Sequence, residues 1–120
     1  MDKAQELYQA GRSAMAAGDL TKAVGLFEQS NKAAEHFKTA ELLGECLLSL
    51  GKAQEAIRPL TRATELNKQG RGPSLLAKAY LTLGAHDSAR RAAEEALLRT
   101  PGNRLALSVL AELKSANVRV

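Results

Sequence analysis

The sequence repeats at a constant interval, and this periodicity constrains the fold more than any other feature. Gly18, Gly51 and Gly84 mark the interval, because the distance along the chain from the first to the second equals that from the second to the third. Such a period is typical of an array of small units, each of which packs against its neighbours. The units are residues 4–36, 37–69 and 70–102, and a remainder follows at residues 103–116.

Each unit contains two segments whose apolar and small residues recur with helical spacing. In the second unit, Ala40, Leu43, Gly44 and Leu47 stand at positions i, i+3, i+4 and i+7. This spacing places them on one face of a helix and favours helices over strands. The predicted helices span residues 4–17, 20–34, 39–50, 53–66, 73–83, 86–99 and 103–116.

Residues that begin and end helices stand at the expected boundaries. Gly18, Gly51 and Gly84 each follow the first helix of a unit, where the left-handed conformation of a C-terminal cap favours glycine. Asp19 can cap the helix that follows. Pro59 is the exception, because it lies inside the second helix of the middle unit, where it removes a backbone hydrogen bond and should introduce a kink.

The repeated residues resemble the tetratricopeptide repeat, whose pattern is W-x2-L-G-x2-Y…A-x3-F…P. The first unit keeps Gly11, Ala23 and Phe27 of this pattern, and the third keeps Tyr80 and Pro101. The chain departs from it in lacking Trp, in lacking the closing Pro in two units, and in having a period one residue shorter than that of the family. The resemblance implies an all-α domain over residues 1–120, a right-handed superhelix (α-solenoid) of three helix-turn-helix units plus a solvating helix at 103–116.

The amino-acid composition limits the classes of protein to which the chain can belong. Hydrophobic residues make up 45% and charged residues 25% of the 120 residues, which is near the average of globular proteins. No apolar run approaches the roughly 18 residues of a membrane-spanning helix, and we expect no secretory signal at the N-terminus. Because one cysteine cannot form an internal disulfide, we expect a cytoplasmic location.

The residues offer no catalytic or metal-binding constellation. The segment Gly44–Lys52 has too many residues between its glycines for a phosphate-binding loop and lies in a predicted helix. His36 and His86 are far apart in the sequence and lack a cluster of further ligands. Cys46 falls on a packing position and is expected to be a small buried hydrophobe. We therefore expect no enzymatic activity, no metal and no cofactor.

Function is then expected on the surface that stacking creates, a concave groove lined by the first helix of each unit. The resemblance assigns the groove to the second, fifth, ninth and twelfth positions of each unit. The predicted peptide-binding residues are Tyr8, Arg12, Met15, Lys38, Glu41, Glu45, Leu48, Arg71, Ser74, Lys78, Leu81, Arg104 and Leu107, with Gln5, Ala111 and Lys114 on the same stripes.

The charge of these positions indicates the kind of partner. Six of the sixteen are basic and two are acidic, and the net charge of +4 lies in residues 70–120. Net charge bears on association, so we expect an interaction module or scaffold that binds a protein or peptide with acidic residues around an apolar anchor. A charged face that is merely solvated is the alternative.

A narrower hypothesis within the family can be compared position by position. Some tetratricopeptide domains hold the C-terminal carboxylate of heat-shock chaperones with Lys and Asn of the first repeat, Asn of the second, and Lys and Arg of the third. The corresponding positions here are Tyr8, Arg12, Leu42, Arg71 and Leu75. Since the two leucines cannot hydrogen-bond a carboxylate, the comparison argues against chaperone tails, and capture of another carboxylate remains open.

Two further functions are alternatives to a peptide groove. Leu107 widens the apolar stripe of the last predicted helix, so a homodimer through this helix is one of them. The other alternative is binding of single-stranded RNA, which the isoelectric point of about 9.5 suggests. RNA recognition of this kind uses stacking side chains, and Tyr8 is the single aromatic residue among the groove positions, which argues against it.

Overall fold

The computed structural model describes residues 1–118, with side chains as far as Ala116. Within these residues the chain forms seven helices and no strand, which confirms the all-α prediction. Each predicted helix boundary lies within two residues of the observed one. The helices are α1 (Lys3–Ala16), α2 (Leu20–Ala33), α3 (Phe37–Ser49), α4 (Ala53–Leu66), α5 (Gly72–Thr82), α6 (His86–Arg99) and α7 (Arg104–Val118).

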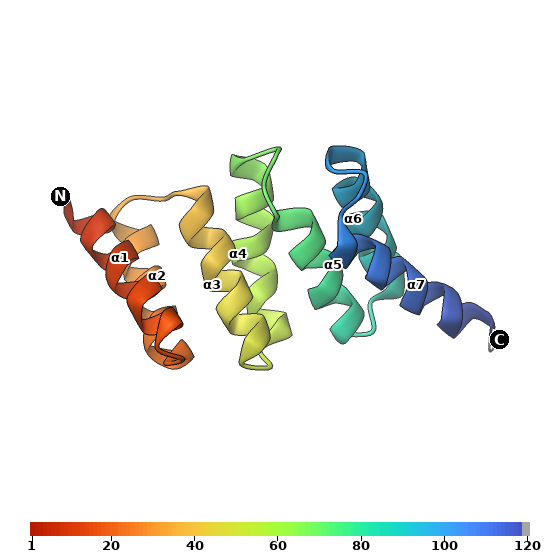
Figure 1. Cartoon of the computed structure of the whole chain (residues 1–120), viewed down its shortest axis with the longest axis horizontal. Coiled ribbons are helices and arrows are strands. Elements are labelled where there is room, and N and C mark those ends of the chain that lie inside the picture. Colours follow the sequence, from red (N-terminus) through yellow and green to blue (C-terminus); the bar gives the residue numbers. More distant parts are fainter. Residues whose placement is uncertain (119–120) are drawn as a thin grey trace.

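The helices form an elongated array of consecutive antiparallel pairs. Each helix packs against the next, and α5 also packs against α3 and α7. The array measures 52 × 26 × 20 Å, and Figure 1 shows the helices following one another along its length, with the two ends of the chain far apart. None of the helices in residues 1–118 is long and apolar enough to cross a membrane.

The same glycine-based turn closes the first helix of each pair. Gly18, Gly51 and Gly84 adopt φ values of 83°, 78° and 76°, as predicted for left-handed caps. In the first turn, the N–H of Asp19 donates to the carbonyl of Ala14 at 2.9 Å, and the equivalent bonds recur in the other two. These bonds satisfy carbonyls that a helix end leaves without partners. The side chain of Asp19 caps α2, as predicted.

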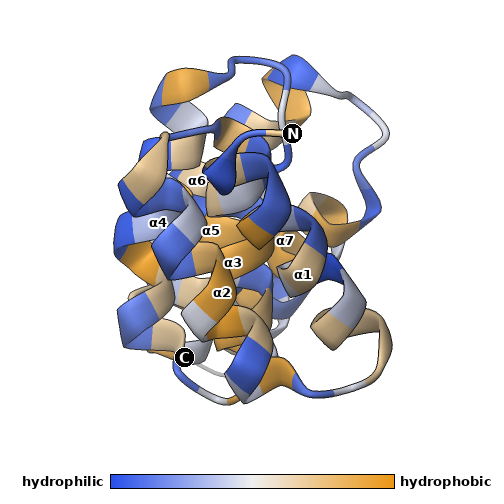
Figure 2. Cartoon of the chain, turned by 90° about the vertical axis from the view of Figure 1, so that its left-hand side faces the viewer, coloured by the Kyte–Doolittle hydropathy of each residue, from blue (hydrophilic) through white to orange (hydrophobic). Residues whose placement is uncertain are grey.

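The core lies between the paired helices and depends on small residues facing large ones. Figure 2 shows the apolar residues where the helices face each other and hydrophilic residues outside. An added Cβ at Gly11 would lie 2.6 Å from Phe27 Cε1, and one at Gly44 would overlap the side chain of Leu60. Glycine is therefore required at these two crossings.

In the third pair of helices, the residues that face each other at the equivalent contact have side chains of different sizes from those in the first two pairs. Ala77 occupies the position in the third unit that Gly44 occupies in the second, and Ala93 likewise corresponds to Leu60. Both alanines are fully buried in one cluster with Val109. A larger first residue is accommodated here because the facing residue is smaller, so the helices can still approach closely.

Candidate functional site

The predicted groove residues lie on α1, α3, α5 and α7 or at their N-termini, a surface that we call the odd-helix face. Their exposure divides them into three groups. The exposed ones are Arg12, Lys38, Arg71, Lys78, Arg104 and Leu107. The partly buried ones are Tyr8, Met15, Glu45, Leu48 and Leu81. The buried ones are Glu41 and Ser74.

Two predicted contact residues, Glu41 and Ser74, are buried and form hydrogen bonds within the protein. Glu41 is 2% exposed and Ser74 is 4% exposed. The Glu41 carboxylate accepts the backbone N–H of Arg71 at 2.7 Å, and the Ser74 hydroxyl donates to the Arg71 carbonyl at 3.1 Å. The prediction that these side chains are presented at the surface is wrong, because both hold the start of α5 in place.

Arg71 is exposed but already has a partner. Its guanidinium Nη2 forms an ion pair with Glu45 Oε2 at 2.6 Å, which links α5 to α3. Its positive charge is therefore largely neutralised within the protein, and it contributes less to the field of the odd-helix face than its sequence position indicates.

Four other predicted contact residues are cations that form no ion pair with any residue in the described part of the chain. They are Arg12, Lys38, Lys78 and Arg104. The Arg12 guanidinium lies 5.9 Å from the centre of the Tyr8 ring, and this ring packs at 6.1 Å against Phe27. Tyr8 is thus fixed between the core and a cation, in a geometry that allows cation–π attraction.

Apolar side chains lie on the same face, near the C-terminal ends of α1, α3 and α5. Met15, Leu48 and Leu81 are partly buried and rest against the core. Each comes from the end of its helix, at the twelfth position of its unit. The odd-helix face therefore combines cations that lack partners with a row of partly exposed apolar groups.

A cavity of about 590 Å³ adjoins this face at its N-terminal end. Its walls include Ala4 and Tyr8 of α1, Ala34 and His36 of the α2–α3 connection, and Lys38 of α3. Its volume is within the roughly 300–1,000 Å³ of ligand pockets. The sequence predicted Tyr8 and Lys38 but missed the connection, because helical periodicity does not specify the path between helices.

Hydrogen bonding orients the polar groups at the mouth of this cavity. His36 Nδ1 accepts the backbone N–H of Lys38 at 3.1 Å and so caps α3, and its ring stacks on Phe37 at 4.8 Å. Because Nδ1 is an acceptor, the proton of the neutral ring is on Nε2. The cavity thus combines apolar walls with a hydrogen-bond donor and the ammonium group of Lys38, and the carboxylates of Asp2 and Glu35 also line it.

The structure also locates the residues with metal-binding or nucleophilic potential. Within residues 1–118, no three His, Cys, Asp or Glu side chains lie close enough to hold a metal ion. Cys46 is fully buried among the residues of the core, as predicted. Burial, and secondly the charge of Glu45, raises the pKa of the Cys46 thiol.

We expect Cys46 to resist alkylation in the folded protein. The thiolate is the reactive form of cysteine, and this thiol is both buried and protonated at neutral pH. Labelling with iodoacetamide should be slow without denaturant and rise to the rate of an unstructured peptide as urea unfolds the chain. Fast labelling of the native protein would contradict this assignment.

Two family models match the sequence and together cover most of it. One, described as anaphase-promoting complex, cyclosome, subunit 3, matches residues 1–63. The other, described as tetratricopeptide repeat, matches residues 74–103. The chain belongs to the tetratricopeptide-repeat family. The predicted resemblance is confirmed, and the helical array is the solenoid of this family.

Solved tetratricopeptide domains have the same fold. The first such domain of Spaghetti (RPAP3), bound to the HSP90 peptide SRMEEVD, has a TM-score of 0.90 and 20% identity and matches 97% of this chain and 94% of that one. The second domain of human RPAP3, in complex with the HSP70 peptide SGPTIEEVD, has a TM-score of 0.87 and 22% identity, and the match covers 92% of this chain and 94% of that one. The MamA protein has a TM-score of 0.89 and 22% identity, over 96% of this chain and 64% of its own. No curated protein matches the sequence.

Proposed function

We propose that this tetratricopeptide domain is a protein-interaction module that binds an acidic peptide segment across its odd-helix face. The observation that carries the proposal is the set of cations without ion-pair partners in the described chain, Arg12, Lys38, Lys78 and Arg104, on a face that also carries partly exposed apolar side chains. Solved relatives of the same fold hold acidic peptides, which supports this class of partner.

The two kinds of group contribute in different ways. An apolar side chain of the peptide would fill the cavity beside Tyr8, where burial supplies most of the affinity. The surrounding cations mainly raise the rate of association and select acidic partners.

The proposed partner is an internal acidic segment rather than a chaperone C-terminus. Leu42 and Leu75, which occupy two positions of the chaperone clamp, are buried in the core. Arg71, the one basic match, is bound to Glu45. A C-terminal carboxylate would therefore find no amide at these positions, and Arg12 would be the one guanidinium there without an ion-pair partner among the described residues.

We expect the double substitution Lys38→Glu with Lys78→Glu to weaken binding of an acidic peptide about tenfold or more at low salt, because two attractive charges become repulsive. The probe is a fluorescent peptide with blocked ends that carries one leucine flanked by glutamates, and the readout is fluorescence anisotropy. The same peptide with a free C-terminus should bind with equal affinity.

A control with the same change in net charge separates local contacts from the overall field. Lys22 and Lys68 are exposed and do not belong to α1, α3, α5 or α7. Both can be changed to Glu in one variant. This variant should keep most of the affinity. Equal losses in the two variants, or no loss in either, would overturn the proposed site. Arg71 is unsuitable for this test because its reversal would also repel Glu45.

One further observation favours self-association as a second candidate function. Leu107 on α7 is 48% exposed and stands beside Ala111 on the same exposed stripe. A second copy could cover these residues. Light scattering at two protein concentrations distinguishes this function, since a mass that stays that of the monomer at both contradicts it.

A further inference from the structure

A second groove lies away from the odd-helix face, between α2 and α4. It is an open groove of about 920 Å³, and its floor includes Ala40, Leu43 and Leu47 of α3, which are all buried. Ile57 and Pro59 of α4 add apolar surface to one wall. The 14 residues of α4 correspond to about 21 Å of helix, which is long enough for several side chains of a bound segment.

Acidic residues outnumber basic ones around this groove. Glu28 and Glu55 are exposed and form no ion pair with the residues that the structure describes, whereas Glu35 and Glu65 both bind Arg62. With Arg58, which is also exposed, the lining contains four glutamates and two arginines. The groove is therefore locally negative on a chain whose net charge is +4.

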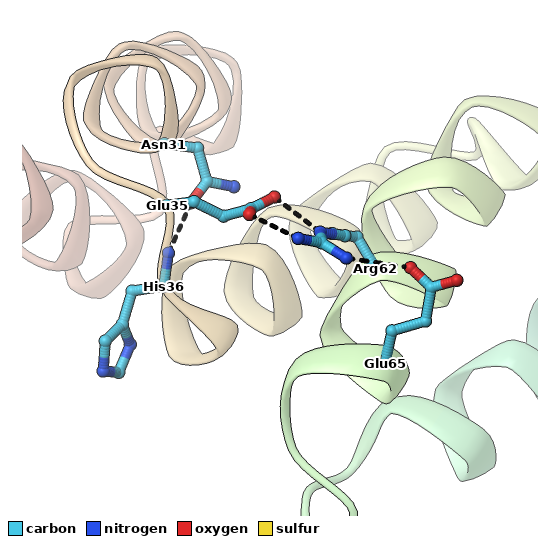
Figure 3. Close-up of polar contacts among 5 residues, drawn as sticks. All are labelled: Asn31, Glu35, His36, Arg62 and Glu65. Carbon is cyan, nitrogen blue, oxygen red and sulfur yellow. Dashed lines mark hydrogen bonds and ion pairs between the residues drawn. The ribbon is translucent and has the colours of Figure 1, made fainter.

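The ion pairs of Arg62 leave one negative charge uncompensated at the end of the groove. Its Nε and Nη2 contact the two oxygens of Glu35 at 2.8 Å each, and Nη1 contacts Glu65 at 3.2 Å (Figure 3). The hydrogen bond from Arg62 lowers the pKa of the Glu35 carboxyl, so Glu35 is ionised at neutral pH. Three charged side chains thus sum to one negative charge there.

Pro59 supplies an additional hydrogen-bond acceptor. α4 continues without interruption from Ala53 to Leu66 through this proline. Since proline has no N–H, the carbonyl of Glu55 cannot receive the usual bond from the residue four positions later. Glu55 and Pro59 both line the groove.

We propose that the α2–α4 groove binds a basic amphipathic segment of a second protein. Apolar side chains of that segment would pack on the partly exposed Ile57 and Pro59, over the floor that Leu43 and Leu47 form, while its Lys or Arg side chains would pair with Glu28 and Glu55. The proposal does not depend on the acidic partner of the odd-helix face. Together the two sites make the module an adaptor whose opposite charge preferences keep two partners on separate surfaces.

The test uses two synthetic amphipathic peptides with leucines at helical spacing. One carries lysine at all other positions, and its counterpart carries glutamate there. We expect the lysine peptide to shift the NMR signals of Leu43, Leu47 and Ile57. The double substitution Glu28→Gln with Glu55→Gln should weaken its binding about tenfold, because two charge pairs are lost while the exposed side chains keep their size.

Matched variants make each outcome decisive. Glu94→Gln with Glu112→Gln changes the net charge equally at exposed sites elsewhere and should leave binding of the lysine peptide almost unchanged. Lys38→Glu with Lys78→Glu should also leave it intact, which separates this proposal from the previous one. The proposal would be overturned if the lysine peptide shifted signals of the odd-helix face alone, or if the control variant weakened its binding equally. It would also be overturned if the protein formed dimers that the Glu28→Gln and Glu55→Gln substitutions abolished.

Discussion

Replacing Gly44 with alanine should lower the free energy of unfolding by about 1–3 kcal/mol, the usual effect of overpacking a core. The new Cβ would overlap Leu60, whose side chain is fully buried and cannot move away without displacing its neighbours. Urea denaturation measures the change. Gly25→Ala is the matched control, because an added Cβ there meets open space, and it should be neutral or stabilise the helix by about 0.5–1 kcal/mol.

The same crossing allows a sharper measurement with a double-mutant cycle. Leu60→Ala alone should cost about 2–5 kcal/mol, because it leaves a cavity. The double variant should cost less than the sum of the two single variants, since the new alanines recreate the combination that Ala77 and Ala93 already form in the third repeat. Strict additivity would show that Gly44 and Leu60 do not exclude each other sterically.

Replacing Glu41 with alanine should lower the free energy of unfolding by about 1.5–3 kcal/mol, the range for a hydrogen bond to a charged group. The substitution removes the carboxylate that accepts the backbone N–H of Arg71 at 2.7 Å. Gly70 packs so closely against this carboxylate that an added Cβ would overlap Glu41 Oε2. Urea denaturation gives the loss of stability, and hydrogen exchange of the Arg71 amide should become faster.

Two variants separate the buried hydrogen bond from surface charge. Glu41→Gln keeps an acceptor and should cost less than Glu41→Ala. Glu45→Ala removes a carboxylate from the same helix and the same arginine, but the ion pair it breaks is solvent-exposed and should cost at most about 1 kcal/mol. A cost for Glu45→Ala as large as that for Glu41→Ala would contradict the structural role assigned to Glu41.

The repeat period and the apolar spacing within each unit were sufficient to predict the helices, because helix formation depends on local interactions, and the resemblance to the family supplied their superhelical arrangement. The left-handed glycines at positions 18, 51 and 84 and the burial of Cys46 follow from helical spacing and turn chemistry within single units. Each of these features is decided by residues close together in the sequence. The seven predicted helices consequently agree with the structure over residues 1–118.

The candidate site was less predictable, because its geometry depends on connections between units. Tyr8, Glu41 and Ser74 share the fifth position of their units, yet the first is partly exposed and the others are buried. The α4–α5 connection brings the backbone of Arg71 against Glu41, and helical periodicity contains no information about that path. The acidic α2–α4 groove was missed for a related reason, since its lining comes from three helices and a loop.

The equivalent position in the second helix of each unit is Phe27 in the first unit, Leu60 in the second and Ala93 in the third, so the two ends of the array are packed differently. In α6 the fully packed residues are alanines, whereas α2 and α4 each bury a large side chain. Because the stability of a repeat array comes from each unit and its neighbours, we expect α6 to depend on its contacts with Val109 and Leu113 of α7 more than α2 and α4 depend on theirs. A ligand that contacts both Arg12 and Lys78 would span the first and third units, so we expect its binding to raise the free energy of unfolding of the array.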